Sequence, residues 1–303
     1  MKVAIVGLPL YAKRVCDSLN TFLGKKAFYP FDTYYSKKDK LTFLLKVKSM
    51  DAIFSINGGI AQSKVFDLAI KHQIPLLVMW TGTDVINALR NFHNGHFQQK
   101  YIDYPSHICD GPNLVSEVKE MGIDGPFFNF QSFEVDSIPT PFNNLKILTR
   151  IGKGREPFYG MDKIIALANH FPEIVFTAVG TDGYPGHILP LNINCIEWTD
   201  QMPELYQSHA LALRLPDHDG LSPFVLEAMS FGNHVCYINE LPNTFHTPEI
   251  SDVTRVIEDF QVQLKTTGEI KPNISGYEYV KTQFNPSKVN KEIIDLITNL
   301  INC

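Results

Sequence analysis

Two acidic residues stand on either side of a predicted helix start in the second half of the chain. Asp219 lies in a loop that leads to Ser222 and Pro223, residue types suited to the N-cap and to the first helical position. Glu227 follows about one helical turn further on. Both carboxylates could therefore reach one polar ligand, beside helix N–H groups that favour an anion. Taken singly, Asp219 suits a loop cap and Glu227 an exposed helix acid.

Composition excludes several classes of function. The 303 residues carry a formal net charge of -5, which argues against a general nucleic-acid binder. The five cysteines are odd in number, far apart and without metal-binding spacing, so neither a disulfide framework nor a metal site is predicted. No apolar run reaches the roughly 18 residues of a membrane span. We expect a cytoplasmic protein.

The chain repeats a strand-then-helix pattern in each half. Short apolar runs such as KVAIVG, DAIFSI and IPLLVMW alternate with helical segments, and the pattern restarts at KILTRI. Such alternation predicts parallel sheets covered by helices. Between the halves, FEVDSIPTPFNNLK has two prolines and no period, which is typical of a linker. We therefore predict α/β domains at 1–140 and 141–285, followed by an amphipathic helix at 286–303 that packs back on the first domain.

Glycine-containing loops follow most of the predicted strands. In parallel α/β sheets the ligand lies beyond the carboxyl ends of the strands, and two facing domains would place a cleft there. Any one glycine has a plain interpretation as a tight turn, but six such loops together favour binding. The loop after the first strand has only Gly7 and lacks GxGxxG, so a dinucleotide site of the usual kind is disfavoured.

The segment DHDGLSPFVLEAMSFGNHV resembles the signature of retaining GT-B glycosyltransferases of family four: an acid, seven residues, Glu, Ala-Met, a small residue and Gly. The resemblance covers roughly the second half of the chain, through the turn at Gly180 and the segment CIEWTDQMPELYQSHALALRLP. It implies two Rossmann-like doubly wound domains that face each other across a cleft, with the acceptor bound by the domain at 1–140 and the nucleotide-sugar donor by the domain at 141–285. The residues in register are Asp219, Glu227, Ala228, Met229 and Gly232.

The resemblance implies a role for each matched residue. Glu227 would accept hydrogen bonds from the ribose hydroxyls of a nucleotide sugar, and Asp219 would bind hydroxyls of the donor sugar. The backbone N–H groups of Gly220, Leu221 and Ser222 would approach the sugar and the diphosphate. The family transfers the sugar by a front-face displacement without metal, so no cofactor is expected beyond the donor itself. Gly180, Gly7 and Arg150 complete the predicted donor-binding set.

The cationic loop after the second domain's first strand departs from the family pattern. The family uses an Arg and a Lys there to stabilise the leaving diphosphate. The usual lysine before Gly-x-Asp is Tyr159 in this chain. We predict Lys153 and Arg155 as the catalytic cations, because both lie past the strand end, and Arg150 as the weaker choice. Asp219 is also one methylene shorter than the commoner Glu.

Three functions stay open at this point. The first is a glycosyltransferase acting on an unidentified acceptor such as a glycan or a lipid-linked molecule. The second is a nucleotide-sugar or carbohydrate binding protein that has lost the chemistry, and the third is a sugar-nucleotide epimerase. The lysine-rich segment 36–51 has its leucines at helical offsets, which favours an ordinary helix over the sheet. Its alternative is contact with an anionic membrane or an anionic acceptor.

Overall fold

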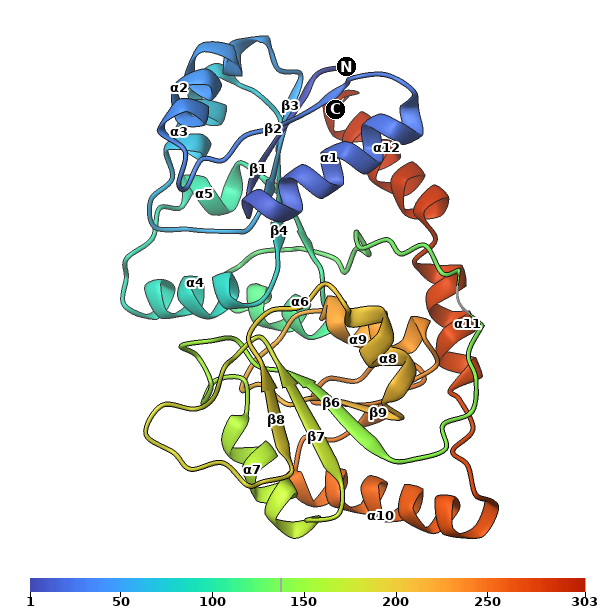
Figure 1. Cartoon of the computed structure of the whole chain (residues 1–303). Coiled ribbons are helices and arrows are strands. Elements are labelled where there is room, and N and C mark those ends of the chain that lie inside the picture. The colour runs from blue at the N-terminus through green and yellow to red at the C-terminus, as the bar shows by residue number, and fades with distance from the viewer. Residues whose placement is uncertain (137, 303) are drawn as a thin grey trace. The chain divides into compact units, whose positions relative to one another are not determined.

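The computed structural model describes residues 1–136 and 138–302, which form two compact units (Figure 1). Unit 1 contains residues 1–132 together with the chain from Pro286 onwards, and unit 2 contains Phe133–Asn285. The division thus falls after residue 132 rather than after residue 140. The Phe133 N–H donates to the carbonyl of Phe284 at 2.9 Å and its ring packs against that of Phe284, so the chain joins unit 2 before the predicted linker ends.

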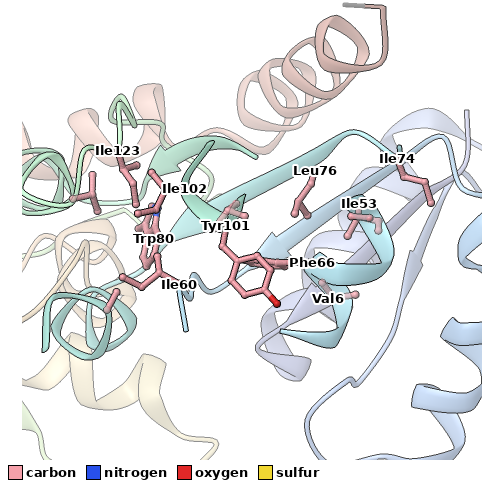
Figure 2. Packing of buried hydrophobic residues seen from close by; sticks show 14 of the residues in the cluster. Val6, Ile53, Ile60, Phe66, Ile74, Leu76, Trp80, Tyr101, Ile102 and Ile123 are labelled. Atoms are coloured by element: carbon pink, nitrogen blue, oxygen red, sulfur yellow. The ribbon is translucent and has the colours of Figure 1, made fainter. Parts of the chain in front are cut away.

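Unit 1 is built on a five-stranded sheet in the order β2-β1-β3-β4-β5, with all neighbouring strands parallel. Strands β1, β3 and β4 are buried along their whole length, as expected of parallel strands covered on both faces. Figure 2 shows one side of this core, where the rings of Phe66 and Tyr101 meet edge to face. The strands are β1 (Val3–Gly7), β2 (Phe28–Pro30), β3 (Ala52–Ile56), β4 (Leu76–Trp80) and β5 (Ser106–Cys109).

The helices of unit 1 cover this sheet. The C-terminal helix α12 lies beside α1, and its Val289, Ile293 and Ile297 are buried with residues of both β1 and β3. The predicted amphipathic helix near the C-terminus is therefore present. The helices are α1 (Pro9–Leu23), α2 (Lys37–Lys46), α3 (Lys64–His72), α4 (Thr83–His93), α5 (Lys100–Asp103), α6 (Pro112–Lys119) and α12 (Pro286–Asn302), with a 3-10 turn η1 (Val47–Ser49).

Unit 2 repeats the plan with a six-stranded parallel sheet in the order β11-β10-β9-β6-β7-β8. Its strands are β6 (Lys146–Arg150), β7 (Val175–Val179), β8 (Ile193–Ile196), β9 (Leu211–Arg214), β10 (His234–Tyr237) and β11 (Phe245–His246). Its helices are α7 (Met161–His170), α8 (Met202–Ser208), α9 (Pro223–Ser230), α10 (Ile250–Thr267) and α11 (Ile274–Gln283). Within the residues described, no helix combines the length and the apolar character needed to cross a bilayer.

Helix α2 does not cover the sheet with its leucines. Phe43 is its one buried residue, whereas Leu41, Leu44 and Leu45 are 60%, 52% and 77% exposed. The predicted sheet-covering helix is present, because Phe43 packs in the core with Val6 and Ile53, and the leucines lie on its exposed side. They form an outward stripe at positions i, i+3 and i+4, which we call the α2 leucine stripe.

The contact of α12 with unit 1 gives a stability prediction. Replacing Ile293→Ala removes a side chain that is 2% exposed and leaves a cavity beside α1. The free energy of unfolding should fall by about 2–5 kcal/mol. The matched control Thr298→Ala, on an exposed position of the same helix, should change it by less than about 0.5 kcal/mol. Urea unfolding followed by circular dichroism measures both, and equal stabilities would show that α12 does not support unit 1.

Candidate functional site

The candidate site of unit 2 lies where the order of its strands reverses. The chain runs from β6 to β7 and β8 on one side of the sheet, and later returns to β9 on the other side of β6. The carboxyl ends of β6 and β9 therefore flank a topological switch point, which is where open α/β sheets bind ligands. Arg150 ends β6 and Arg214 ends β9, so two arginines stand at this edge.

Arg214 and Asp219 form a buried ion pair at this point. The Arg214 Nε donates to Asp219 Oδ2 at 2.6 Å and Nη2 donates to Oδ1 at 3.1 Å, a two-point contact that fixes both side chains. The side chains are only 10% and 15% exposed. Burial alone would lower the pKa of Arg214, but the Asp219 carboxylate outweighs it and holds that pKa above its usual value. The guanidinium also lies 5.0 Å from the ring centre of Tyr159.

The loop before α9 is fixed by hydrogen bonds from the neighbouring strand. The Tyr237 hydroxyl donates to the carbonyl of Gly220, and the Asn239 amide donates to the carbonyl of Asp219 at 3.1 Å. The Leu221 side chain is buried in the adjacent core cluster. These contacts fix two backbone carbonyls and one side chain of the loop. The loop therefore leads into α9 in a single conformation.

Helix α9 begins at Pro223 with Ser222 at the N-cap, as the sequence predicts. The Ser222 side chain, however, accepts no capping hydrogen bond, so its predicted capping role is wrong. The Ser222 side chain is 3% exposed, and the sequence alone does not reveal whether a buried serine at this position makes the capping bond. Those first N–H groups of α9 lack carbonyl partners inside the helix, as at any helix start.

Glu227 lies half-buried in a helix whose other central residues are buried. Its Oε2 accepts a hydrogen bond of 2.8 Å from the Tyr206 hydroxyl, whereas Oε1 accepts none from the residues that the structure describes. Burial and the nearby Glu227 carboxylate raise the pKa of Tyr206, and the positive charge of Arg150 opposes them. Tyr206, Glu227 and Arg150 are thus close enough to interact, with one carboxylate oxygen left for a ligand.

The predicted cations Lys153 and Arg155 are engaged elsewhere. The Lys153 ammonium pairs with Asp182 at 2.9 Å and with Glu197 at 2.7 Å. These two carboxylates raise its pKa, so the lysine stays charged but its charge is already balanced. The Arg155 guanidinium lies over the rings of Phe158 and Tyr159, at 4.2 and 5.4 Å from their centres.

The predicted glycines, Gly180 and Gly7, are required by the backbone conformation of the turns in which they lie. Gly180 has φ +99°, and a Cβ there would lie 2.4 Å from the carbonyl oxygen of Ile151. Its own carbonyl accepts a hydrogen bond from the Lys153 N–H at 2.9 Å, which joins the two loops. Gly7 belongs to unit 1, has φ +101° and would bring a Cβ within 2.0 Å of the Ile56 carbonyl oxygen. Both positions require glycine for the fold alone.

Unit 2 therefore brings Asp219, Gly220, Ser222, Glu227 and Arg150 to one edge of its sheet. Sequence reasoning missed two partners of these residues, Arg214 and Tyr206. Arg214 had a readable signal, since it is the one charge in the apolar run LALRLP and a buried charge needs a partner. Tyr206 had none, because a tyrosine on a short helix is consistent with packing alone.

Comparison with known proteins identifies the fold. No family model and no curated protein sequence matches the chain. Among solved structures, Anabaena HepE in complex with UDP-glucose matches with a TM-score of 0.72 and 13% identity, covering 99% of this chain and 100% of that one. Sucrose-phosphate synthase from Thermosynechococcus elongatus matches with a TM-score of 0.71 and 10% identity, covering 100% and 99%.

An epimerase shares the same architecture. UDP-GlcNAc 2-epimerase from Neisseria meningitidis, bound to UDP-GlcNAc, matches with a TM-score of 0.51 and 13% identity, covering 99% of this chain and 100% of that one. Identities this low show the fold alone. The predicted fold class is confirmed: the chain has two parallel α/β units of the kind found in GT-B glycosyltransferases.

Proposed function

We propose that this protein is a retaining, metal-independent glycosyltransferase that moves a sugar from a nucleoside-diphosphate sugar to an acceptor, either a carbohydrate or a lipid-linked molecule. One observation carries the proposal. At the switch point of unit 2 a carboxylate with an unengaged oxygen, Glu227, stands beside Arg150 and the start of α9. A carboxylate, a cation and helix N–H groups match the hydroxyls and the diphosphate of such a donor.

Different residues of unit 2 bind different parts of the donor. Glu227 Oε1 accepts hydrogen bonds from the ribose hydroxyls, while Tyr206 holds the other carboxylate oxygen in place. The diphosphate lies at the N–H groups of the loop 220–222 and the first turn of α9. Asp219, which Arg214 holds in place, accepts hydrogen bonds from hydroxyls of the donor sugar. Gly180 and Leu221 provide backbone at these loops, whereas Gly7, which lies in unit 1, has no part in this arrangement.

Transfer then needs positioning and charge stabilisation rather than a protein nucleophile. An acceptor hydroxyl oxygen bonds to the anomeric carbon from the face that the diphosphate leaves. The bond from that carbon to the diphosphate oxygen breaks, and the leaving phosphate oxygen takes the acceptor proton. The negative charge that builds on the diphosphate is stabilised by Arg150 and Arg214, with Lys153 and Arg155 in the adjoining loop. Lys153 contributes only when a ligand draws it from Asp182 and Glu197.

A binding protein without transfer activity is the second candidate. The observation that favours it is the state of the cationic loop, in which Tyr159 takes the lysine position and Lys153 is balanced by two carboxylates. Incubation with a panel of radiolabelled nucleotide sugars separates the candidates. A transferase releases labelled sugar or glycoside, an epimerase returns a changed nucleotide sugar without an acceptor, and a binding protein leaves the donor unchanged.

Glu227→Gln tests the donor site. The glutamine keeps an oxygen for Tyr206 but loses the charge that accepts ribose hydroxyls, and charged hydrogen bonds contribute about 1.5–3 kcal/mol. Affinity for the best nucleoside diphosphate should therefore fall by roughly tenfold or more. Isothermal titration calorimetry measures it, with Glu204→Gln, an exposed acid on α8, as the matched control. Wild-type affinity in Glu227→Gln would remove Glu227 from the site.

Asp219 has a structural role as the partner of the buried Arg214, and this role must be separated from any role in transfer. Asp219→Asn leaves the buried Arg214 charge without its partner and should lower the free energy of unfolding by about 3–5 kcal/mol. The double variant Asp219→Asn with Arg214→Met removes both charges and should recover most of that stability, yet remain inactive. Chemical unfolding and the labelled-donor assay measure the two effects. A stable Asp219→Asn protein, or an active double variant, would contradict this account.

A further inference from the structure

The ring of Tyr159 contacts two guanidinium groups at the switch point of unit 2. The Arg155 guanidinium is 5.4 Å from the ring centre, and the Arg214 guanidinium is 5.0 Å from it. A guanidinium is attracted to the face of an aromatic ring when it lies within about 6 Å of the ring centre. Arg155 belongs to the loop after β6 and Arg214 ends the neighbouring strand β9. One aromatic side chain therefore contacts cations from two different segments.

Tyr159 is itself fixed by its surroundings. A Cβ at Gly152 would lie 2.6 Å from the Tyr159 ring, so the ring occupies the space that this glycine leaves. The ring of Phe158 meets it edge to face, with the centres 5.3 Å apart. The Phe158 carbonyl accepts a hydrogen bond of 2.9 Å from the Asp217 N–H, which joins this loop to the loop after β9. The Tyr159 ring is thus a rigid support between the two loops.

Arg155 depends on this support more than Arg214 does. Arg214 is already fixed by its two-point ion pair with Asp219. Arg155 is exposed, and among residues 1–136 and 138–302 no carboxylate pairs with it. A long exposed side chain without fixed contacts samples many rotamers, and ordering it when a ligand binds costs free energy. The contacts with the rings therefore restrict Arg155 before a ligand arrives.

The ring contacts leave the N–H groups of Arg155 available. Its guanidinium lies over the rings of Phe158 and Tyr159, so the contacts use the face of the group. The N–H bonds of a guanidinium point outward in its plane, and contact with a ring does not engage them. In the described part of the chain these N–H groups donate no hydrogen bond. Such a cation suits an anion with several oxygens.

Two cations on one support match the charge of a diphosphate. A leaving diphosphate carries negative charge on both phosphates, and cations that are already in position stabilise this charge best. Nη1 of Arg214 lies 3.5 Å from the carbonyl oxygen of Arg150, the last residue of β6. The ring of Tyr159 therefore stands beside the same edge at which the proposed function places the diphosphate.

We propose that Tyr159 is a positioning residue for the transfer reaction. Its ring holds Arg155 near Arg214, and the two guanidiniums together bind the diphosphate of the donor and stabilise it as it leaves. Tyr159 itself acts only through the arginines. The identity of the leaving group rests on the proposed function, whereas the binding of a diphosphate to the two arginines does not.

Inorganic pyrophosphate tests the pair of arginines, because a diphosphate group is common to all nucleoside diphosphates. Isothermal titration calorimetry on the full chain should show tighter binding of pyrophosphate than of inorganic phosphate. Tyr159→Leu removes the ring and should weaken pyrophosphate binding by about three- to tenfold, because the ligand must then order Arg155. Tyr159→Phe keeps the ring and should restore most of the affinity. Equal affinities of Tyr159→Leu and the wild type would overturn the inference.

Arg155→Lys separates position from charge at an exposed residue, where a substitution leaves the fold intact. Lysine keeps the charge but lacks the planar group that lies over the rings. The affinity for pyrophosphate should fall about as far as in Tyr159→Leu, and the double variant should fall no further, because both changes remove the same contact. Wild-type affinity in Arg155→Lys, or losses that multiply in the double variant, would contradict the inference.

Lys281→Gln is the matched control for these variants. It removes a cation that lies 5.3 Å from the ring centre of Tyr277 on α11, a contact of the same kind away from the switch point. Its affinity for pyrophosphate should equal that of the wild type. A loss as large as that of Arg155→Lys would show that pyrophosphate responds to the overall charge of the chain and would overturn the inference.

Failure of this inference is distinguishable from failure of the proposed function. In the labelled-donor assay Tyr159→Leu should lower kcat at least as much as it lowers pyrophosphate affinity, since the charge on the diphosphate grows in the transition state. If pyrophosphate binding depends on Tyr159 but no sugar is transferred, the paired arginines stand and the transferase does not. If wild type and Tyr159→Leu transfer sugar with the same kcat, the transferase stands and Tyr159 has no positioning role.

Discussion

The buried ion pair of Arg214 and Asp219 is the interaction on which the candidate site depends. An arginine at the end of a buried strand would be costly without compensation. Asp219 supplies the opposite charge, the Tyr159 ring covers the guanidinium and the Arg150 carbonyl lies 3.5 Å from Nη1. Because the ion pair with Arg214 fixes Asp219, the loop from Asp219 to Ser222 leads into α9 in a single conformation. That arrangement places Glu227 and the first N–H groups of α9 at the same edge.

The same constraint of parallel sheets acts in both units. The first strand of each, β1 or β6, has the second strand on one side and a later strand on the other. Helices that cover opposite faces diverge at such a reversal and leave space at the carboxyl ends. In unit 2, Arg150, Arg214 and Glu227 lie at the edge of that space. In unit 1, the space contains a pocket lined by lysines and apolar side chains. The same architecture therefore leaves space at the carboxyl ends of the strands in both units.

Regular patterns in the sequence predicted the elements well. Apolar runs predicted the strands, and Ser222 with Pro223 predicted the start of α9, because burial and capping leave local marks. Properties that depend on distant partners escaped prediction. The pairing of Lys153 with Asp182 and Glu197 joins three loops, and the outward direction of the α2 leucine stripe depends on Phe43 taking the inward position. The early joining of Phe133 to unit 2 depends on Phe284, far along the chain.

Hydrogen–deuterium exchange of the full chain, with and without the nucleoside diphosphate that most raises its melting temperature, tests the central claim most directly. A donor bound at the unit 2 switch point should slow exchange in the loop 217–222, the first turn of α9 and the segment after β6, because ligand contacts suppress local opening. Segments remote from that edge, such as α10, should exchange at unchanged rates. Protection confined to other segments, or no protection at a saturating concentration of ligand, would contradict the assignment of a donor site to unit 2.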